Sequence, residues 1–202
     1  MKEKEEKLKI LAAADIHGDV GIAKKLAEKA KKNKVDLVVL LGDLHGMQGG
    51  EDVITPFKKA NQRVVFVPGN WDSSFEANTL RDLHKVKNLD GYYATYNGVG
   101  IVGIGNPDFQ LELDEKTTFD KLKKNFDKMK PRKRILISHL HAAGTKAEFS
   151  GFPGSKGIKK AIDYFQPDFF MSGHIHEAEG LEEKIGKTKV LNVGDKGEII
   201  LI

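Results

Sequence analysis

The stretch LKILAAADIHGD, residues 8–19, decides the fold of this chain. Residues 8–14 are apolar apart from one lysine, which predicts a buried strand that ends where the polar residues begin at Asp15. Apolar side chains then recur at helical spacing with Lys and Glu between them, which predicts an amphipathic helix over 19–33. A buried strand, a short loop and a helix make up the repeating unit of α/β folds.

The unit recurs along the first half of the chain, and hairpins follow it. Strands are expected at 35–41, 64–67, 92–96, 99–104, 134–137, 168–171, 181–185, 188–193 and 198–202, and helices at 51–61, 73–85, 116–130 and 158–165. The turn Asn97-Gly98 joins two of these strands in a hairpin. The pattern predicts two packed sheets with helices outside. Without repeats or low-complexity linkers, residues 1–202 are expected to form a single domain, with 1–7 as a flexible leader.

Composition narrows the chemistry. The 202 residues include no cysteine, which excludes disulfides, thiolate nucleophiles and cysteine-ligated metals, so any metal must bind His, Asp, Glu or Asn. The net charge is +4, yet only four residues are arginine and they form no stripe, so no stable nucleic-acid complex is expected. No apolar run approaches the roughly 18 residues that span a bilayer, and the charged first residues are unlike a signal peptide. No membrane partner and a cytoplasmic location are therefore expected.

Polar residues collect just after five of the predicted strands. They are Asp15-x-His17, Gly42-Asp43, Gly69-Asn70-x-Asp72, His139 and Gly173-His174-x-His176. The carboxyl ends of strands in α/β sheets form the edge where ligands bind, so we expect seven side chains to converge there. These are Asp15, His17, Asp43, Asn70, His139, His174 and His176. Such a set suits two divalent ions about 3.5 to 4 Å apart, with one shared carboxylate and room for a phosphate.

Two local expectations accompany this site. On an extended backbone, alternate side chains point to the same side, which would pair Asp15 with His17 and His174 with His176. The glycines at positions 42, 69 and 173 would let the chain turn sharply as it leaves each strand.

The ordered series resembles the calcineurin-like metallophosphoesterase superfamily, specifically its small single-domain phosphodiesterases, and the turn at 191–194 resembles one that they carry before a final strand. The resemblance implies an α/β/β/α sandwich of two mixed sheets and a two-metal site. Asp15, His17 and His176 resemble the ligands of one metal. Asn70, His139 and His174 resemble those of the other, and Asp43 resembles the bridge. A hydroxide shared by the ions is the implied nucleophile. Manganese is the favoured ion, with iron, cobalt, nickel and zinc as alternatives.

One departure from the family pattern concerns proton transfer. Trp71 stands where the family carries the histidine thought to protonate the leaving group, and an indole cannot do so. We therefore expect a phosphodiesterase whose small substrates, nucleotides among them, need little leaving-group protonation, or a substitute acid. His141 is the favoured substitute, acting beside Asp43 and Asn70, and His45 with Asp72 behind it is the other candidate. Trp71 could stack on a base or aryl group, or simply pack against the wall of the site.

Several plainer interpretations stay open. The fold also hosts phosphomonoesterases, and the similar retromer scaffold subunit is a protein-interaction platform without catalysis. Asp15 and Asp43 could cap helices, Asn70 could be a turn residue, and His84 is expected at the surface. The loop over 144–157 is either a substrate rim or an ordinary surface loop. Gly98-x-Gly-x-x-Gly103 matches a dinucleotide fingerprint but lies in a predicted hairpin strand, so it is discarded.

Overall fold

The first sheet is built around the strand predicted at the start of the chain. The computed structural model describes residues 7–46 and 52–202. The order of this five-stranded sheet is β11-β1-β2-β3-β4. Its members are β1 (Lys9–Ala13), β2 (Leu37–Leu41), β3 (Val64–Val67), β4 (Lys87–Asn88) and β11 (Glu198–Leu201). The first four run parallel and β11 pairs antiparallel with β1, so four carboxyl ends share one edge.

The second sheet has six strands in the order β5-β6-β7-β8-β10-β9. They are β5 (Tyr93–Tyr96), β6 (Val99–Ile104), β7 (Lys133–Ser138), β8 (Phe169–Ser172), β9 (Glu182–Ile185) and β10 (Thr188–Asn192). Strands β6, β7, β8 and β10 are parallel, and the outer strands β5 and β9 are antiparallel to their neighbours. This mixed sheet again places several carboxyl ends at one edge.

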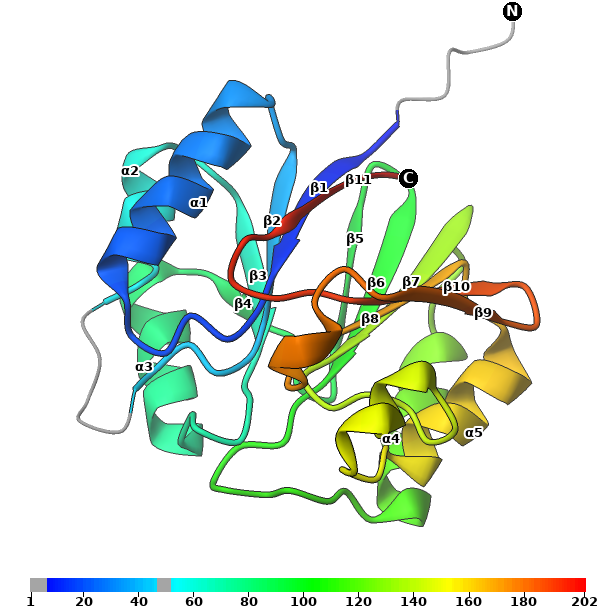
Figure 1. Cartoon of the computed structure of the whole chain (residues 1–202). Coiled ribbons are helices and arrows are strands. Elements are labelled where there is room, and N and C mark those ends of the chain that lie inside the picture. Colours follow the sequence, from blue (N-terminus) through cyan, green and yellow to red (C-terminus); the bar gives the residue numbers. More distant parts are fainter. Residues whose placement is uncertain (1–6, 47–51) are drawn as a thin grey trace, which may run out of the picture.

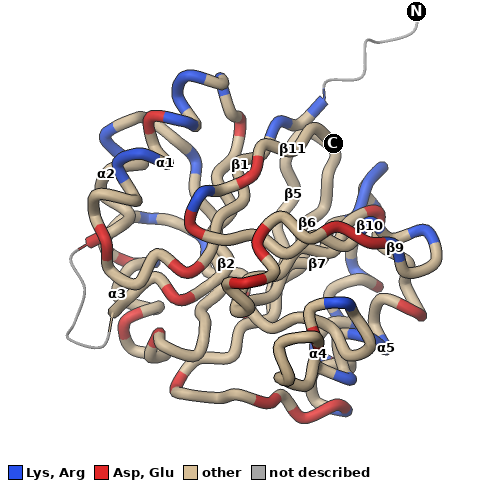
Figure 2. Tube along the Cα trace, viewed as in Figure 1, with Lys and Arg blue, Asp and Glu red and all other residues tan. Residues whose placement is uncertain are grey.

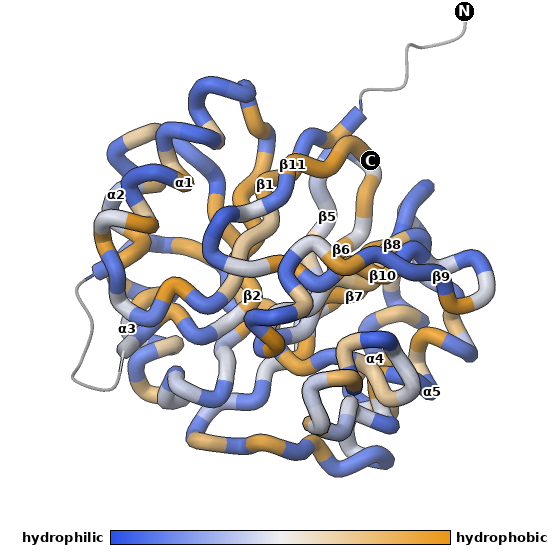
Figure 3. Tube along the Cα trace, viewed as in Figure 1, coloured by the Kyte–Doolittle hydropathy of each residue, from blue (hydrophilic) through white to orange (hydrophobic). Residues whose placement is uncertain are grey.

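Helices cover the outer face of each sheet (Figure 1). Helices α1 (Val20–Lys32), α2 (Thr55–Lys59) and α3 (Ser74–His84) lie on the first sheet, and α4 (Glu115–Phe126) and α5 (Lys156–Phe165) lie on the second. Buried residues form one cluster between the sheets and one between each sheet and its helices. In Figure 3 the strands β1 and β2 are coloured largely as hydrophobic, whereas the edge strand β9 is mostly hydrophilic. The predicted α/β/β/α sandwich is confirmed.

Burial on both faces explains why the strands are continuous apolar runs. In β1, Ile10 faces the core between the sheets, whereas its neighbour Leu11 faces the helices. The helices begin at polar caps. The Asp19 carboxylate accepts a hydrogen bond from the backbone N–H of Ile22 at 3.0 Å, and Ser73 forms a reciprocal capping box with the residue three positions on.

Some predicted boundaries were wrong. The helix expected over 116–130 ends at Phe126, and the backbone N–H groups of Lys128 and Met129 then donate to carbonyls three residues back instead of four. The helix expected over 51–61 is only the five residues Thr55–Lys59, and its predicted start at 51 lies outside the described residues, as does most of the leader. Strand β4 and two 3₁₀ turns, Lys146–Ser150 and His176–Ala178, were not predicted.

Charge is spread over the surface. Figure 2 shows Lys and Arg on the outer helices and strand ends, interleaved with Asp and Glu, with no continuous basic stripe in that view. In the part of the chain that the structure describes, no helix is long and apolar enough to cross a membrane.

Candidate metal centre

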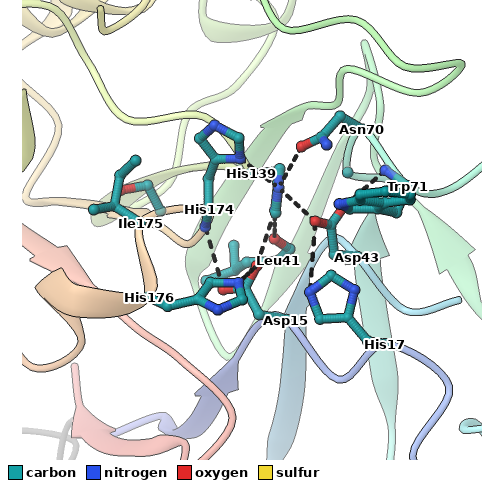
Figure 4. Close-up of polar contacts among 12 residues, drawn as sticks. Asp15, His17, Leu41, Asp43, Asn70, Trp71, His139, His174, Ile175 and His176 are labelled. Carbon is teal, nitrogen blue, oxygen red and sulfur yellow. Dashed lines mark hydrogen bonds and ion pairs between the residues drawn. The ribbon is translucent and has the colours of Figure 1, made fainter. Parts of the chain in front are cut away.

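All seven predicted ligands lie together where the strands of both sheets end (Figure 4). Six of them form two groups of three, and within each group the possible ligand atoms lie within 4.8 Å of one another. The groups are Asp15 with His17 and His176, and Asp43 with His139 and His174. The amide oxygen of the seventh, Asn70, lies 3.0 Å from Nε2 of His139. Each group mixes carboxylate and imidazole, which suits a divalent transition metal.

The first group contains an unsatisfied carboxylate oxygen. Asp15 is 7% exposed, and its Oδ1 is buried without a hydrogen-bond partner. Its Oδ2 accepts a hydrogen bond from the backbone N–H of His174 at 3.2 Å. Nε2 of His176 lies 3.6 Å from Oδ1. Buried polar atoms are almost always paired, so a cation held by these side chains would fit the site.

Asp43 belongs to the second group and also faces the first. Its Oδ2 is 3.2 Å from Nε2 of His139 in the second group and 3.9 Å from Nε2 of His17 in the first. Its Oδ1 accepts a hydrogen bond from the backbone N–H of Trp71 at 2.9 Å, which fixes the carboxylate. One oxygen of Asp43 therefore faces a histidine of each group, the placement that a bridging ligand requires.

His139 is fully buried and held on both ring nitrogens. Nδ1 donates a hydrogen bond to the carbonyl of Leu41 at 2.8 Å, which turns Nε2 toward Asp43. Nδ1 of His174 lies 3.2 Å from the same Nε2. Burial lowers the pKa of His139, but the Asp43 carboxylate outweighs it and raises that pKa to about 9. Burial, with His139 beside it, lowers the pKa of His174 to about 4. In the metal-free protein the proton therefore rests on His139, and a metal would replace it.

Several of the predicted ligands have left-handed backbone. Asp15, His17, Asp43 and His174 have φ of 58°, 48°, 51° and 70°. The expectation of extended backbone at Asp15-x-His17 and at His174-x-His176 was therefore wrong. The side chains converge because the chain enters left-handed turns as it leaves β1, β2 and β8. Such conformations cost about 1 kcal/mol or more per non-glycine residue and collect at functional sites.

The glycines serve two different purposes. Gly42 has φ of +86° and makes the expected turn. Gly69 and Gly173 do not adopt positive φ. A Cβ atom on Gly69 would lie 2.2 Å from Oδ1 of Asp43, and one on Gly173 would lie 2.4 Å from Cβ of Ala14. The chain does turn after both glycines, since the carbonyl of Gly69 accepts from the backbone N–H of Asp72 and that of Gly173 from the backbone N–H of Ile175. Glycine is needed at both positions because neighbouring loops touch there.

The candidate acids lie behind the ligands. Nδ1 of His45 is 3.0 Å from Oδ1 of Asp72, whose Oδ2 accepts a hydrogen bond from the backbone N–H of Gly69. Burial lowers the pKa of His45, but Asp72 outweighs it and the net shift is upward. His141 is 1% exposed, donates from Nε2 to the carbonyl of Phe152 at 3.2 Å, and leaves Nδ1 unpaired. Burial lowers the pKa of His141.

The structure settles some of the plainer interpretations. Asp19 caps α1, so Asp15 is not the cap. The prediction that His84 lies at the surface was wrong, since its side chain is 11% exposed and its Nε2 lies 2.8 Å from Oδ2 of Asp52. The glycine fingerprint lies in β6, which pairs with β5 and is not followed directly by a helix, so its rejection is confirmed.

Two segments near the site were only partly anticipated. In the loop over 144–157, the ring of Phe152 lies 5.9 Å from that of His174, so this loop forms a rim of the site. Asn192, in the turn noted at 191–194, donates from Nδ2 to the carbonyl of Ile175 and so ties down the segment between His174 and His176. The contact of Phe109 with Trp71, at 5.9 Å between rings, carried no signal in the sequence.

Comparisons with known proteins agree with this geometry. The family model of the calcineurin-like phosphoesterases matches residues 8–178. The search of curated proteins gave no significant match. Among solved structures, TT1561 of Thermus thermophilus is similar with a TM-score of 0.75 and 17% identity, over 95% of this chain and 91% of that one.

Two further structures share the fold at low identity. A dimetal phosphatase from Danio rerio has a TM-score of 0.61 and 12% identity, over 93% of this chain and 88% of that one. A structure described as a novel archaeal phosphodiesterase has a TM-score of 0.53 and 16% identity, over 96% of this chain and 99% of that one. With the family model spanning most of its length, the chain belongs to the calcineurin-like phosphoesterase family.

Proposed function

We propose that this protein is a phosphodiesterase that hydrolyses small phosphoesters with two divalent metal ions, manganese being the favoured one. The observation that carries the proposal is Asp43, whose Oδ2 faces one histidine from each of the two ligand groups. Asp15, His17 and His176 would hold one ion, and Asn70, His139 and His174 the other, with Asp43 shared.

The protein's own residues prepare the site. When bound, two divalent ions supply positive charge for the phosphate and a water of lowered pKa as nucleophile. Two ligand carboxylates against two divalent ions leave a net positive site, which favours an anionic phosphate. Leu41 holds the His139 ring through its carbonyl, and the backbone N–H of Trp71 orients Asp43, so both ligands are positioned before substrate arrives.

The preference for diesters comes from the resemblance to small single-domain phosphodiesterases, and the missing proton donor bears on the leaving group. A phosphoester with an alkyl leaving group needs protonation as its P–O bond breaks, whether it is a monoester or a diester, and Trp71 cannot supply a proton. His141 is our candidate for the substitute acid, with His45 as the alternative. Burial lowers the pKa of His141, which disfavours the protonated form that an acid needs, so we expect substrates with a good leaving group, such as aryl diesters, to react fastest.

The test compares substrates and variants on the manganese-loaded enzyme. We expect kcat/KM for an aryl phosphodiester to exceed that for the matching monoester by about tenfold or more. Replacing His141 by Ala should reduce activity on an alkyl diester by about 100-fold and on an aryl diester far less. His84→Ala, which removes another largely buried histidine, is the matched control and should leave both unchanged.

Each contrary outcome has a definite meaning. A higher kcat/KM for the monoester would make the enzyme a phosphomonoesterase. Equal losses on both diesters would refute the role of His141 as the acid. Absence of both bound metal and activity would favour a non-catalytic scaffold of the same fold.

A further inference from the structure

Aromatic rings lie on two sides of the candidate metal centre, with Trp71 partly buried and the two phenylalanines exposed. On one side, the Trp71 ring lies 6.4 Å from that of His17, and the Phe109 ring meets Trp71 edge to face at 5.9 Å. On the other side, Phe152 lies 5.9 Å from His174. Phe109 is 71% exposed and Phe152 is 53% exposed. Large apolar rings left in solvent beside a polar site are typical of ligand-binding surfaces.

The backbone holds Phe109 in this position. Phe109 has φ of +59° and Asp108 has φ of +63°, a costly pair for residues other than glycine. The backbone N–H of Phe109 donates to the carbonyl of Asn70 at 3.0 Å, and that of Asp108 donates to the carbonyl of Asp72 at 2.9 Å. The loop that carries the ring is therefore fixed to the same turn that carries the proposed ligand Asn70.

A side-chain contact adds to this attachment. The carboxylate of Asp108 accepts hydrogen bonds from the backbone N–H of Ser74 at 2.9 Å and from its hydroxyl. Two consecutive left-handed residues thus persist because four groups hold them, namely two carbonyls of the β3–α3 connection and the backbone N–H and hydroxyl of Ser74 at the start of α3. The result is a phenyl ring kept out of the core and against Trp71, which packing alone does not explain.

The side of the site next to Asp15 has a different chemistry. A pocket of about 510 Å³ there is lined by the ligands Asp15, His17 and His176 and by three further carboxylates, Asp19, Glu179 and Asp195. Glu179 is paired with Lys196, but the carboxylates of Asp19 and Asp195 repel a second phosphate, which disfavours a phosphate chain extending in this direction. The aromatic side therefore offers the better place for a substituent of the phosphoester.

From these observations we propose that Trp71 and Phe109 form a subsite for a flat aromatic substituent of the substrate, with Phe152 as the opposite rim. The substrate class is then a phosphodiester that carries a nucleobase or an aryl ring. The inference rests on the proposed function, because it places the phosphorus at the metal centre. Phe109 acts as a specificity-determining residue, since nothing places it among the reacting atoms.

Trp71 provides the measurement, because it is the only tryptophan in the chain. Its fluorescence would be followed while the metal-loaded protein is titrated with AMP, ribose 5-phosphate, phenylphosphonate or methylphosphonate. We expect AMP or phenylphosphonate to bind about tenfold more tightly than the partner without a ring and to change the Trp71 emission. If AMP binds more tightly than ribose 5-phosphate but phenylphosphonate binds no better than methylphosphonate, the subsite accepts a nucleobase. If both aromatic ligands are preferred equally over their ring-free partners, the subsite accepts any aromatic ring.

Variants separate the subsite from the metal centre. Phe109→Ala should reduce the preference for the aromatic ligand to about twofold and leave the Kd of methylphosphonate unchanged, whereas Phe109→Tyr should retain the preference. Phe75→Ala is the matched control, because Phe75 is 79% exposed on α3 and contacts none of these rings.

The aromatic subsite and the proposed function can be refuted separately. If wild-type protein binds the aromatic and ring-free ligands equally, or if Phe109→Ala keeps the full preference, the subsite is refuted even when metal and activity are present. If the protein binds no metal and hydrolyses nothing, the proposed function fails, and the same fluorescence titration still decides whether the aromatic side binds a ring.

Discussion

The contact between two loops at Gly69 gives a quantitative prediction. Replacing Gly69 by Ala would place a Cβ atom 2.2 Å from Oδ1 of Asp43, 2.4 Å from its backbone nitrogen and 2.9 Å from its Cγ. None of these atoms can move freely, because Oδ1 is held by the backbone N–H of Trp71 at 2.9 Å and the backbone nitrogen belongs to the turn after β2. The loops must separate by about 1 Å to reach ordinary contact distances.

We estimate the cost from this overlap. Forcing extra atoms into a packed region typically costs about 1–3 kcal/mol, and the rigid neighbours place Gly69→Ala near about 3 kcal/mol. For a chain of this length, each kcal/mol lowers Tm by about 2–4 °C, so we expect a fall of about 6–12 °C. Because Asp43 is the proposed shared ligand, the variant should also lose metal affinity at temperatures where it is fully folded.

Gly180→Ala is the matched control. Gly180 has φ of +80°, and a Cβ atom added there would meet no other atom within 4 Å, so only backbone strain of about 1 kcal/mol is expected, with metal binding unchanged. Circular dichroism melts in EDTA measure the stability, and calorimetric titration with Mn²⁺ measures the affinity. If both variants melt together and bind Mn²⁺ as the wild type does, the proposed contact between the loops is wrong.

Three further outcomes follow from caps, charge and protonation. Ser73→Ala removes the capping box of α3 and should lower the free energy of unfolding by about 1 kcal/mol. We expect Tm to fall by about 2–4 °C with unchanged Mn²⁺ binding, and an unchanged Tm would contradict the role of the cap. Burial raises the pKa of Asp168, but backbone and Lys133 contacts outweigh it and lower that pKa in the fold. The Asp168 carboxylate therefore stabilises the fold by about 1 kcal/mol, after allowance for solvent screening, above about pH 4, and this stabilisation is lost below that pH. The free energy of unfolding of Asp168→Asn should be lower than that of wild type at about pH 7 and should converge with it near about pH 2. Without metal, His139 beside Asp43 has a pKa of about 9, so Mn²⁺ binding should release a proton. The apparent affinity for Mn²⁺ should therefore rise by up to about tenfold per pH unit between about pH 6 and 9. Calorimetry in buffers of different ionisation enthalpy measures the release, and finding none would contradict this protonation of His139.

The sequence was sufficient for the architecture because local and tertiary signals agree there. Strand β3 was predicted at its observed bounds, since residues buried on both faces leave an unbroken apolar run. The capping box at Ser73 was predicted because its two partners are three residues apart. The ligands could be grouped because parallel strands share one edge for their carboxyl ends, whatever the details of the loops.

What the sequence did not predict depends on contacts between distant segments. His84 is largely buried because Asp52 lies across from it, and a lysine-rich helix end gives no sign of this. Asp15 and His174 adopt left-handed backbone, which Asp and His do more often than most residues but still uncommonly, so residue type alone did not locate the turns. Phe109 is held beside Trp71 by backbone hydrogen bonds that any residue could make, which leaves no signature in the sequence.

The central claim, two metal ions that share Asp43, is tested most directly by counting bound manganese per chain at saturation. We expect two equivalents in the wild type and one in His176→Ala, whose side chain belongs only to the first ligand group. A circular dichroism spectrum that matches wild type would show that the variant is folded. A wild-type protein that binds one manganese or none, or a His176→Ala variant that still binds two with wild-type affinity, would contradict the account.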